Sequence, residues 1–275
     1  MKFFRANRPL TINEMIKFAP AAFAEKAASD VSKNYSFLST KSLIETLEKK
    51  NILPFAVAQI KSRSDEAKET AKHLIRFRHT DYKVELDEIV PEIVLETSHD
   101  AKSSFKFSLG LFRLVCENGL VAPCSILDTI RIKHVKAEDV DVIDAAYEVL
   151  ENRETAIENI LEMKKKVLTI NDRLNFANEA VNLRWDKENE RPEFEIEKLL
   201  KPRRKIDAEL DLWTTFNVLQ ENLVRGGLSF YKLNDLGYPI ARQSTRAVNS
   251  ISKNLELNKN LWTLANKFLD SRLTL

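Results

Sequence analysis

The feature that most constrains the fold of this chain is a change of pattern near residue 137. Before it, short strand-like runs dominate; after it, apolar residues recur at the three- and four-residue spacing of helices. This order predicts an α+β fold, with an N-terminal antiparallel or mixed sheet and packed helices followed by a mainly α-helical half. We expect a sheet domain over residues 1–136 and a helical region over residues 137–275, with one continuous domain as the alternative.

The first half contains the candidate strands and two candidate helices. Thr11 and Thr40 are typical N-caps, and Glu14 completes a capping box with Thr11. Residues 64–71 form either a loop or a single helical turn. The expected helices cover residues 13–23 and 41–50, and the expected strands cover residues 35–39, 54–61, 72–78, 89–97, 103–109 and 125–133.

The second half predicts one long helix over residues 139–166 with a heptad-like apolar seam. Glu154 and Lys164 interrupt that seam, so we expect packing against neighbouring helices rather than a strict coiled coil. Further helices are expected at 171–185, 195–200, 210–224 and 255–269, with Gly226-Gly227 ending the third of these. The seam comprises Val140, Ile143, Tyr147, Leu150, Ile157, Leu161 and Leu168.

Composition excludes several classes of protein. With 5 glycines and no GK[ST] sequence after the Gly226-Gly227 pair, a glycine-rich phosphate loop is absent and no cofactor is expected. Cys116 and Cys124 are too few for a disulfide framework or a cysteine zinc site, which predicts reduced thiols in a cytoplasmic protein. Charged residues interrupt the apolar N-terminus, so neither a signal peptide nor a membrane span is expected. The formal net charge is +2, so only the distribution of charge is informative.

Ser98, His99 and Asp100 are the three residue types of a hydrolase triad, side by side in "LETSHDAKSSFKFSLG". Adjacent side chains in an extended chain point in opposite directions and cannot converge as a triad must. The stretch lies between two predicted strands, and its polar composition is typical of a hairpin turn. A metal site using His99 and Asp100 is the alternative, but it would need further ligands.

Basic residues alternate with apolar ones along three predicted strands. This pattern predicts a sheet with one apolar face and one positive face, suited to the phosphate backbone of a nucleic acid. The alternative is an ordinary solvated face, with Glu92 and Glu96 neutralising the charge. The candidate phosphate contacts are Lys61, Arg63, Arg76, Arg78 and Lys106.

Two further basic groups lie in the helical half. "KPRRK" at 201–205 contains Arg203 and Arg204, which bind phosphate or simply solvate a linker. Residues 225–245, predicted to be a loop, lead into a group in which aromatic residues interleave with Arg242 and Arg246. That combination favours base stacking together with phosphate contact.

Several segments, in order along the chain, resemble the YfjQ/YafZ-like proteins of plasmids and prophages, a family with a domain of unknown function. They are "RPLT", "YSFLST", "PEIVLETSHDAKSSFK", "GLFRLVCENGLV", "LRW", "KPRR", "DLWTTFNVLQENLVRGG", "TRAVNSI" and "LNKNLWTLA". In that family the turn usually reads SHDG, and Ala101 stands at the glycine position here. This difference indicates that the turn does not require a left-handed residue.

The resemblance implies a mobile-element setting, among antirestriction and DNA-repair-like genes, and supplies no catalytic residues. Some phage relatives resemble Rad52-like single-strand annealing proteins, which pair a sheet with helices and form rings; this is an analogy of fold. We therefore expect a non-enzymatic, homo-oligomeric protein that binds single-stranded DNA without sequence preference and promotes strand annealing and recombination. The alternatives are a counter-defence, antirestriction-like protein that binds a host defence or repair protein, and a metal-dependent nuclease using His99, Asp100 and Glu92 or Glu96.

Overall fold

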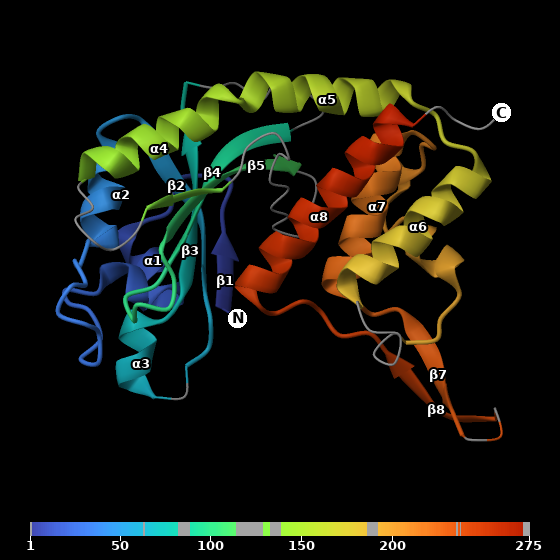
Figure 1. Cartoon of the computed structure of the whole chain (residues 1–275), viewed down its shortest axis with the longest axis horizontal. Helices are drawn as coiled ribbons and strands as arrows, with labels where there is room; N and C mark the ends of the chain where they lie inside the picture. The colour runs from blue at the N-terminus through green and yellow to red at the C-terminus, as the bar shows by residue number, and fades with distance from the viewer. Residues whose placement is uncertain are drawn as a thin grey trace. The chain divides into compact units, whose positions relative to one another are not determined.

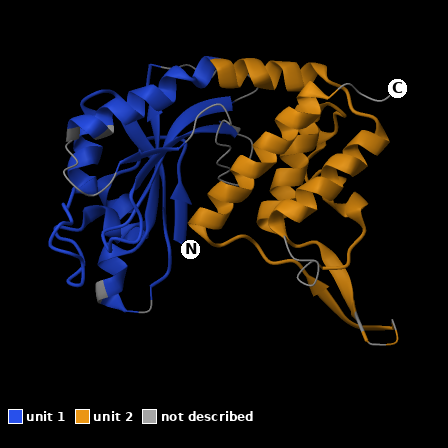
Figure 2. Ribbon diagram, viewed as in Figure 1, with its two compact units in different colours: residues 1–154 blue, residues 155–275 orange. Residues whose placement is uncertain are grey.

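The computed structural model describes residues 2–62, 64–81, 89–113, 129–132, 139–185, 192–234, 236 and 238–271. The chain forms two compact units, Met1–Glu154 and Thr155–Leu275 (Figure 2). The division falls later than the change of sequence pattern near residue 137. Helix α4 (Asp139–Glu151) accounts for the difference, because it packs against the sheet of the first unit.

A six-stranded antiparallel sheet forms the centre of the first unit, with its strands in chain order (Figure 1). This sheet, followed by a mostly helical unit, confirms the predicted α+β fold. The strand expected at 89–97 is present with those limits, whereas residues 35–39 form no strand and lead irregularly into a helix. The strands are β1 (Lys2–Arg5), which we did not predict, β2 (Ile52–Gln59), β3 (His73–His79), β4 (Ile89–Thr97), β5 (Phe105–Arg113) and β6 (Ile130–Ile132).

Short helices accompany this sheet. The predicted Thr11–Glu14 capping box is present at the start of the first of them. Ser39, and not Thr40 as predicted, caps the next, because the Thr40 hydroxyl is buried between the rings of His73 and His99. The helices are α1 (Ile12–Phe18), the 3-10 helix η1 (Pro20–Phe23), α2 (Thr40–Glu48) and α3 (Asp65–Thr70).

The register of the sheet separates an apolar face from a charged one. Ile75, Leu95 and Phe107 are successive cross-strand partners, and all three are fully buried. Directly opposite residues lie on the same face of a sheet, so these side chains define the apolar face. On the other face Glu96 lies between Leu74 and Lys106. Strand β4 is buried along its whole length, so the charged face is buried there too.

The turn between β4 and β5 contains a strained residue. Ala101 has φ of 59°, in the left-handed region that disfavours a Cβ atom. Our expectation that this turn needs no left-handed residue is therefore wrong. The alanine adopts the conformation that the glycine of the SHDG pattern would adopt without strain.

We expect Ala101→Gly to stabilise the protein by about 0.5–1 kcal/mol, because relief of the left-handed strain exceeds the entropy cost of glycine. For a chain of this size the midpoint of thermal unfolding should rise by roughly 1–4 °C in circular dichroism. Ala67→Gly, in the exposed helix α3 of the same unit, is the matched control and should lower stability by about 1 kcal/mol. A lower midpoint for Ala101→Gly would contradict the assignment of strain.

Helices dominate the second unit. The predicted helix over 139–166 is interrupted at Asn152. The predicted seam is buried at Leu150 and Leu168 but wrong at Val140 and Leu161, which are 60% and 37% exposed. The buried stripe of the second part is Ala156, Ile160 and Met163, one residue out of register with the prediction. The helices are α5 (Arg153–Lys165), α6 (Ile170–Arg184), η3 (Ile196–Leu200), η4 (Lys205–Asp207), α7 (Leu212–Arg225) and α8 (Ile251–Asp270).

An aromatic cluster holds α7 and α8 together. The ring centroids of Trp213, Phe216 and Trp262 lie 5.5–6.2 Å apart, in stacked and edge-on arrangements that favour attraction between aromatic rings. Phe176 of α6 packs against Phe268 of α8, with ring centroids 4.8 Å apart and the ring planes tilted by 30°. Within the described part of the chain no helix is long and apolar enough to cross a membrane.

A two-stranded antiparallel hairpin extends from the helices of the second unit (Figure 1). Its strands are β7 (Ser229–Leu233) and β8 (Pro239–Ser244). We predicted a loop over residues 225–245, so this prediction is wrong. Gly226 ends α7 at φ of 67°, as expected for a helix C-cap, and connects it to the hairpin.

Candidate nucleic-acid interface

The residues predicted to form one positive sheet face do not share a face. Gln59 pairs with His73 and the adjacent Ala58 with Leu74, so the polar positions of β2 lie on the side opposite Arg76. Gln59 is itself buried, with its Oε1 accepting from Ala21 N at 2.9 Å. The register of β2 and β3 therefore contradicts the common positive face that the alternation predicted.

Arg76 and Arg78 bind a carboxylate of the protein itself. Their Nε atoms each donate to Glu92 at 2.5 Å, and Arg76 is 1% and Glu92 0% exposed. The Arg76 guanidinium lies 3.1 Å from the ring centroid of Phe112. Burial lowers the pKa of Arg76 to about 10 and Glu92 opposes that shift, so the group remains charged at neutral pH. Our expectation that Arg76 faces solvent is wrong, because β4 supplies its counter-ion in the sheet.

Glu96 lies on the same face of β4 as Glu92, four residues further along the strand. Its Oε1 accepts from Lys106 Nζ at 2.8 Å and Lys72 Nζ at 3.4 Å, and the Lys106 side chain is 28% exposed. The alternative that Glu92 and Glu96 neutralise the positive strands is thus what the geometry favours. Lys61 lies beyond the end of β2 and is exposed, whereas Arg63 lies outside the described residues.

The Ser98-His99-Asp100 stretch forms the turn between β4 and β5, as predicted. Ser98 Oγ donates to Asp100 Oδ1 at 2.6 Å, and His99 Nε2 lies 3.1 Å from Thr40 Oγ1. Ser98 and His99 are fully buried. Burial raises the pKa of Tyr35 to about 12, and the charge of Asp100 adds to this shift. In the described ranges no group of three or more His, Cys, Asp or Glu side chains could hold a metal ion.

Arg203 and Arg204 make contacts within the second unit. Arg203 donates to the Asn222 side chain at 2.7 Å and to the carbonyl of Gly226 at 2.5 Å, where α7 ends. Arg204 pairs with two buried carboxylates, at 3.1 Å for Asp207 and 2.6 Å for Glu221. The geometry therefore gives both arginines a structural role, which the "KPRRK" pattern did not reveal.

The root of the hairpin is tied to the end of α7. Arg184 donates to the carbonyls of Leu223 and Arg246, and burial lowers the pKa of Arg184 to about 10. A Cβ atom at Gly226 would lie 2.6 Å from the carbonyl oxygens of Thr245 and Arg246, so glycine is required at this close approach. These contacts fix the position at which β7 and β8 leave the helices.

The surface of the hairpin combines free cations with exposed aromatic rings. Tyr231 is 57% and Tyr238 66% exposed, and all 6 residues of β8 are exposed. Arg242 lies directly opposite Tyr231. Within the described part of the chain, the side chains of Arg242 and Arg246 make no hydrogen bond or ion pair, unlike Arg76, Arg203 and Arg204.

The side chain of Asn234 bonds to the backbone at the tip of the hairpin. Asn234 Oδ1 accepts from Leu236 N at 3.1 Å and from Tyr238 N at 2.8 Å, an arrangement typical of Asn turns. The apolar residues Leu236 and Ile240 are also exposed, at 80% and 58%. A two-stranded hairpin with both faces in water is marginal by itself, so this surface is a candidate for ligand contact. The Asn-Asp-Leu-Gly tip between two short runs was the sequence signal that could have predicted the hairpin.

Comparisons with known proteins identify a family of unknown function. The profile of the domain of unknown function DUF932 matches residues 27–262. UPF0380 protein YfjQ of Escherichia coli (strain K12) is 36% identical over 265 residues, covering 96% of this chain and 93% of the relative. UPF0380 protein YafZ of the same strain is 36% identical with the same coverage. No solved structure matches, so the similarity to Rad52-like proteins stays a prediction.

Proposed function

The chain belongs to the DUF932 family, and we propose that it binds single-stranded DNA through the β7–β8 hairpin without sequence preference. The observation that carries the proposal is the exposed hairpin, on which Tyr231 lies opposite Arg242, whose side chain has no partner among the described residues. Aromatic rings stack on bases of any sequence, and cations beside them neutralise the phosphate backbone.

Two exposed tyrosines favour a single strand over a duplex. A two-stranded ribbon also fits the major groove of duplex DNA, but the faces of paired bases are hidden there and cannot stack on Tyr231 or Tyr238. Stacking and phosphate contact leave the hydrogen-bonding edges of the bases open. Pairing with a complementary strand can then proceed on the protein, which supports annealing as the activity that follows binding.

Fluorescence anisotropy with an oligothymidylate and a mixed-sequence duplex of equal length tests this function. We expect binding that prefers the single strand and weakens with salt, with a slope of log K against log salt of about −1.4 for two phosphate contacts. Duplex preference would overturn the stacking part of the proposal. No binding at low salt would overturn nucleic-acid binding altogether.

A second candidate function, binding of a host protein, is favoured by one apolar surface of the second unit. Val167 forms a bridge with Asp211, so the segments 167–170 and 206–211, which each expose two aliphatic side chains, meet at this point. Exposed apolar patches of this kind are typical of protein-binding surfaces. This function takes precedence if the anisotropy assay finds no binding of DNA. The exposed side chains are Val167 at 64%, Ile170 at 61%, Ile206 at 60% and Leu210 at 48%.

A further inference from the structure

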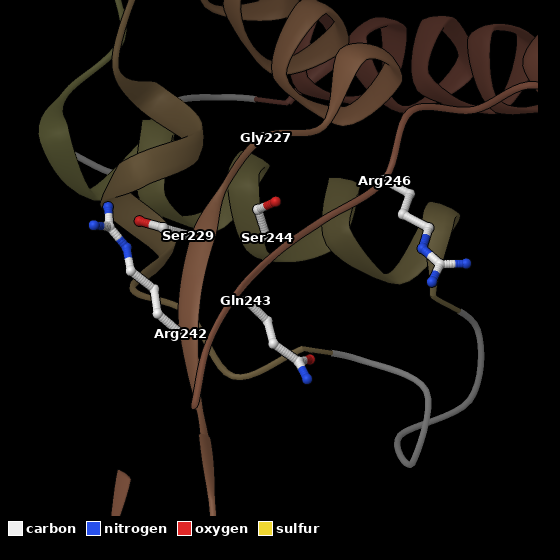
Figure 3. Close-up of a pocket in the computed structure, with 6 residues that line it drawn as sticks. All are labelled: Gly227, Ser229, Arg242, Gln243, Ser244 and Arg246. Carbon is white, nitrogen blue, oxygen red and sulfur yellow. The ribbon is translucent and has the colours of Figure 1, made fainter. Parts of the chain in front are cut away.

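An open hollow of about 610 Å³ lies at the root of the hairpin (Figure 3). Apart from Gly227, the described residues that line it carry hydrogen-bond donors in their side chains, and none of these described residues is a carboxylate. Such a lining suits a ligand rich in acceptor oxygens and negative charge. The lining residues are Gly227, Ser229, Arg242, Gln243, Ser244 and Arg246.

The two arginines of the hollow are held in place by their backbone while their guanidinium groups are free. The carbonyl of Arg246 accepts from Arg184, and Gly227 N donates to the carbonyl of Thr245 at 2.8 Å. Neither Arg242 nor Arg246 has a side-chain partner in the described ranges. Within the described part of the chain, both guanidinium groups are therefore available to an anion that enters the hollow.

The arginines do not converge on one point. In Figure 3 the side chains of Arg242 and Arg246 extend to opposite sides of the hairpin root. A single phosphate group would therefore contact one of them at a time. Separate phosphates of one strand can contact both, which favours a polynucleotide over a mononucleotide or free phosphate.

The register places an aromatic ring one step from this hollow. Tyr231 lies opposite Arg242, and the next pair on the same face is Ser229 and Ser244. Pairs on one face are two residues apart, about 7 Å along the strand, a distance comparable to one nucleotide of an extended single strand. A base on Tyr231 would leave its phosphate near Arg242 and the two hydroxyls.

We infer that the hollow is a phosphodiester-binding subsite in which Arg242 and Arg246 contact different phosphates of one strand. The inference rests on the proposed function and specifies where the backbone of the DNA lies. It predicts that thymidine monophosphate and inorganic phosphate compete poorly with an oligothymidylate. A short oligothymidylate that spans both arginines competes well.

The test compares Arg242→Gln, Arg246→Gln and Lys232→Gln in the full chain. Lys232→Gln is the matched control because it removes the same charge from the same hairpin. Lys232 pairs with Ala241 on the opposite face and is not among the residues that line the hollow. We expect each arginine variant to lose about tenfold in affinity for the oligothymidylate at low salt, and the salt slope to fall by about 0.7 for each. Lys232→Gln should leave the slope unchanged.

The outcomes separate this inference from the proposed function. Equal losses in all three variants would mean that the hairpin attracts DNA by net charge, and the subsite would be refuted while single-strand binding stands. Unchanged binding in both arginine variants, or full competition by thymidine monophosphate, would also refute the subsite. No binding by the wild-type chain would refute the proposed function itself. The emission of Trp213 and Trp262, buried in the same unit, confirms that each variant is folded.

Discussion

Glu92→Gln should destabilise the first unit by about 3–5 kcal/mol. Glu92 is fully buried and accepts from both Arg76 and Arg78 at 2.5 Å. The glutamine is neutral, so it leaves the Arg76 guanidinium charged, buried and without a counter-ion. The stacking of that guanidinium on Phe112 recovers only part of the loss.

The cost comes from an isolated charge, and a triple variant separates this cause from lost packing. Arg76→Met, Arg78→Met and Glu92→Leu together replace the ions by apolar side chains of similar volume, and stability should stay within about 2 kcal/mol of the wild type. If the triple variant were as unstable as Glu92→Gln, shape and not charge would be responsible. A loss below about 1 kcal/mol in Glu92→Gln would contradict the buried pairing.

Urea unfolding followed by two probes assigns the loss to the correct unit. Trp185, Trp213 and Trp262 all lie in the second unit, so tryptophan emission reports that unit alone. Far-UV circular dichroism reports both units. We expect Glu92→Gln to lower the midpoint of the dichroism transition of the first unit. A parallel fall in the tryptophan midpoint would show that the two units unfold cooperatively.

Local patterns in the sequence predicted elements but not how those elements pair. Strand β4 was predicted with its observed limits, because its apolar run stands between clear turn signals. The face on which Arg76 lies depends on the register of β2 and β3, and the bulge between Pro54 and Ala56 shifts that register. No local pattern contains this information, so the sequence alone predicts that the basic side chains of these strands face solvent.

The candidate interface was predicted only in part, for a related reason. Arg242 and Arg246 were identified from their aromatic neighbours, but the surrounding residues were predicted to be a loop. Strands are recognised by alternation of buried and exposed positions, and β8 exposes both of its faces. Conversely, the pattern around Arg203 and Arg204 predicted a free cluster because two of their acceptors, Gly226 and Glu221, lie far along the chain.

Removal of the hairpin should abolish DNA binding without unfolding the chain. Residues 230–243 can be replaced by Asn-Gly, because Ser229 and Ser244 are paired and a two-residue turn can join paired strands. The bonds of the root remain, including the one from Thr245 N to the carbonyl of Leu228 at 3.0 Å. Loss of two stacking rings and one phosphate contact predicts at least about a 100-fold fall in affinity for an oligothymidylate.

A matched control shows whether the hairpin matters as a site or as a source of charge. Lys267→Gln removes one exposed cation from α8. The excision removes the same net charge, because residues 230–243 contain Asp235 as well as Lys232 and Arg242. Binding by this control should change less than about threefold, because Lys267 is not part of the proposed contact and salt screens the attraction of other exposed charges. If the excised chain binds as the wild type does, the interface lies elsewhere. If it binds weakly but the control is equally weak, long-range attraction rather than stacking and direct phosphate contact accounts for the affinity.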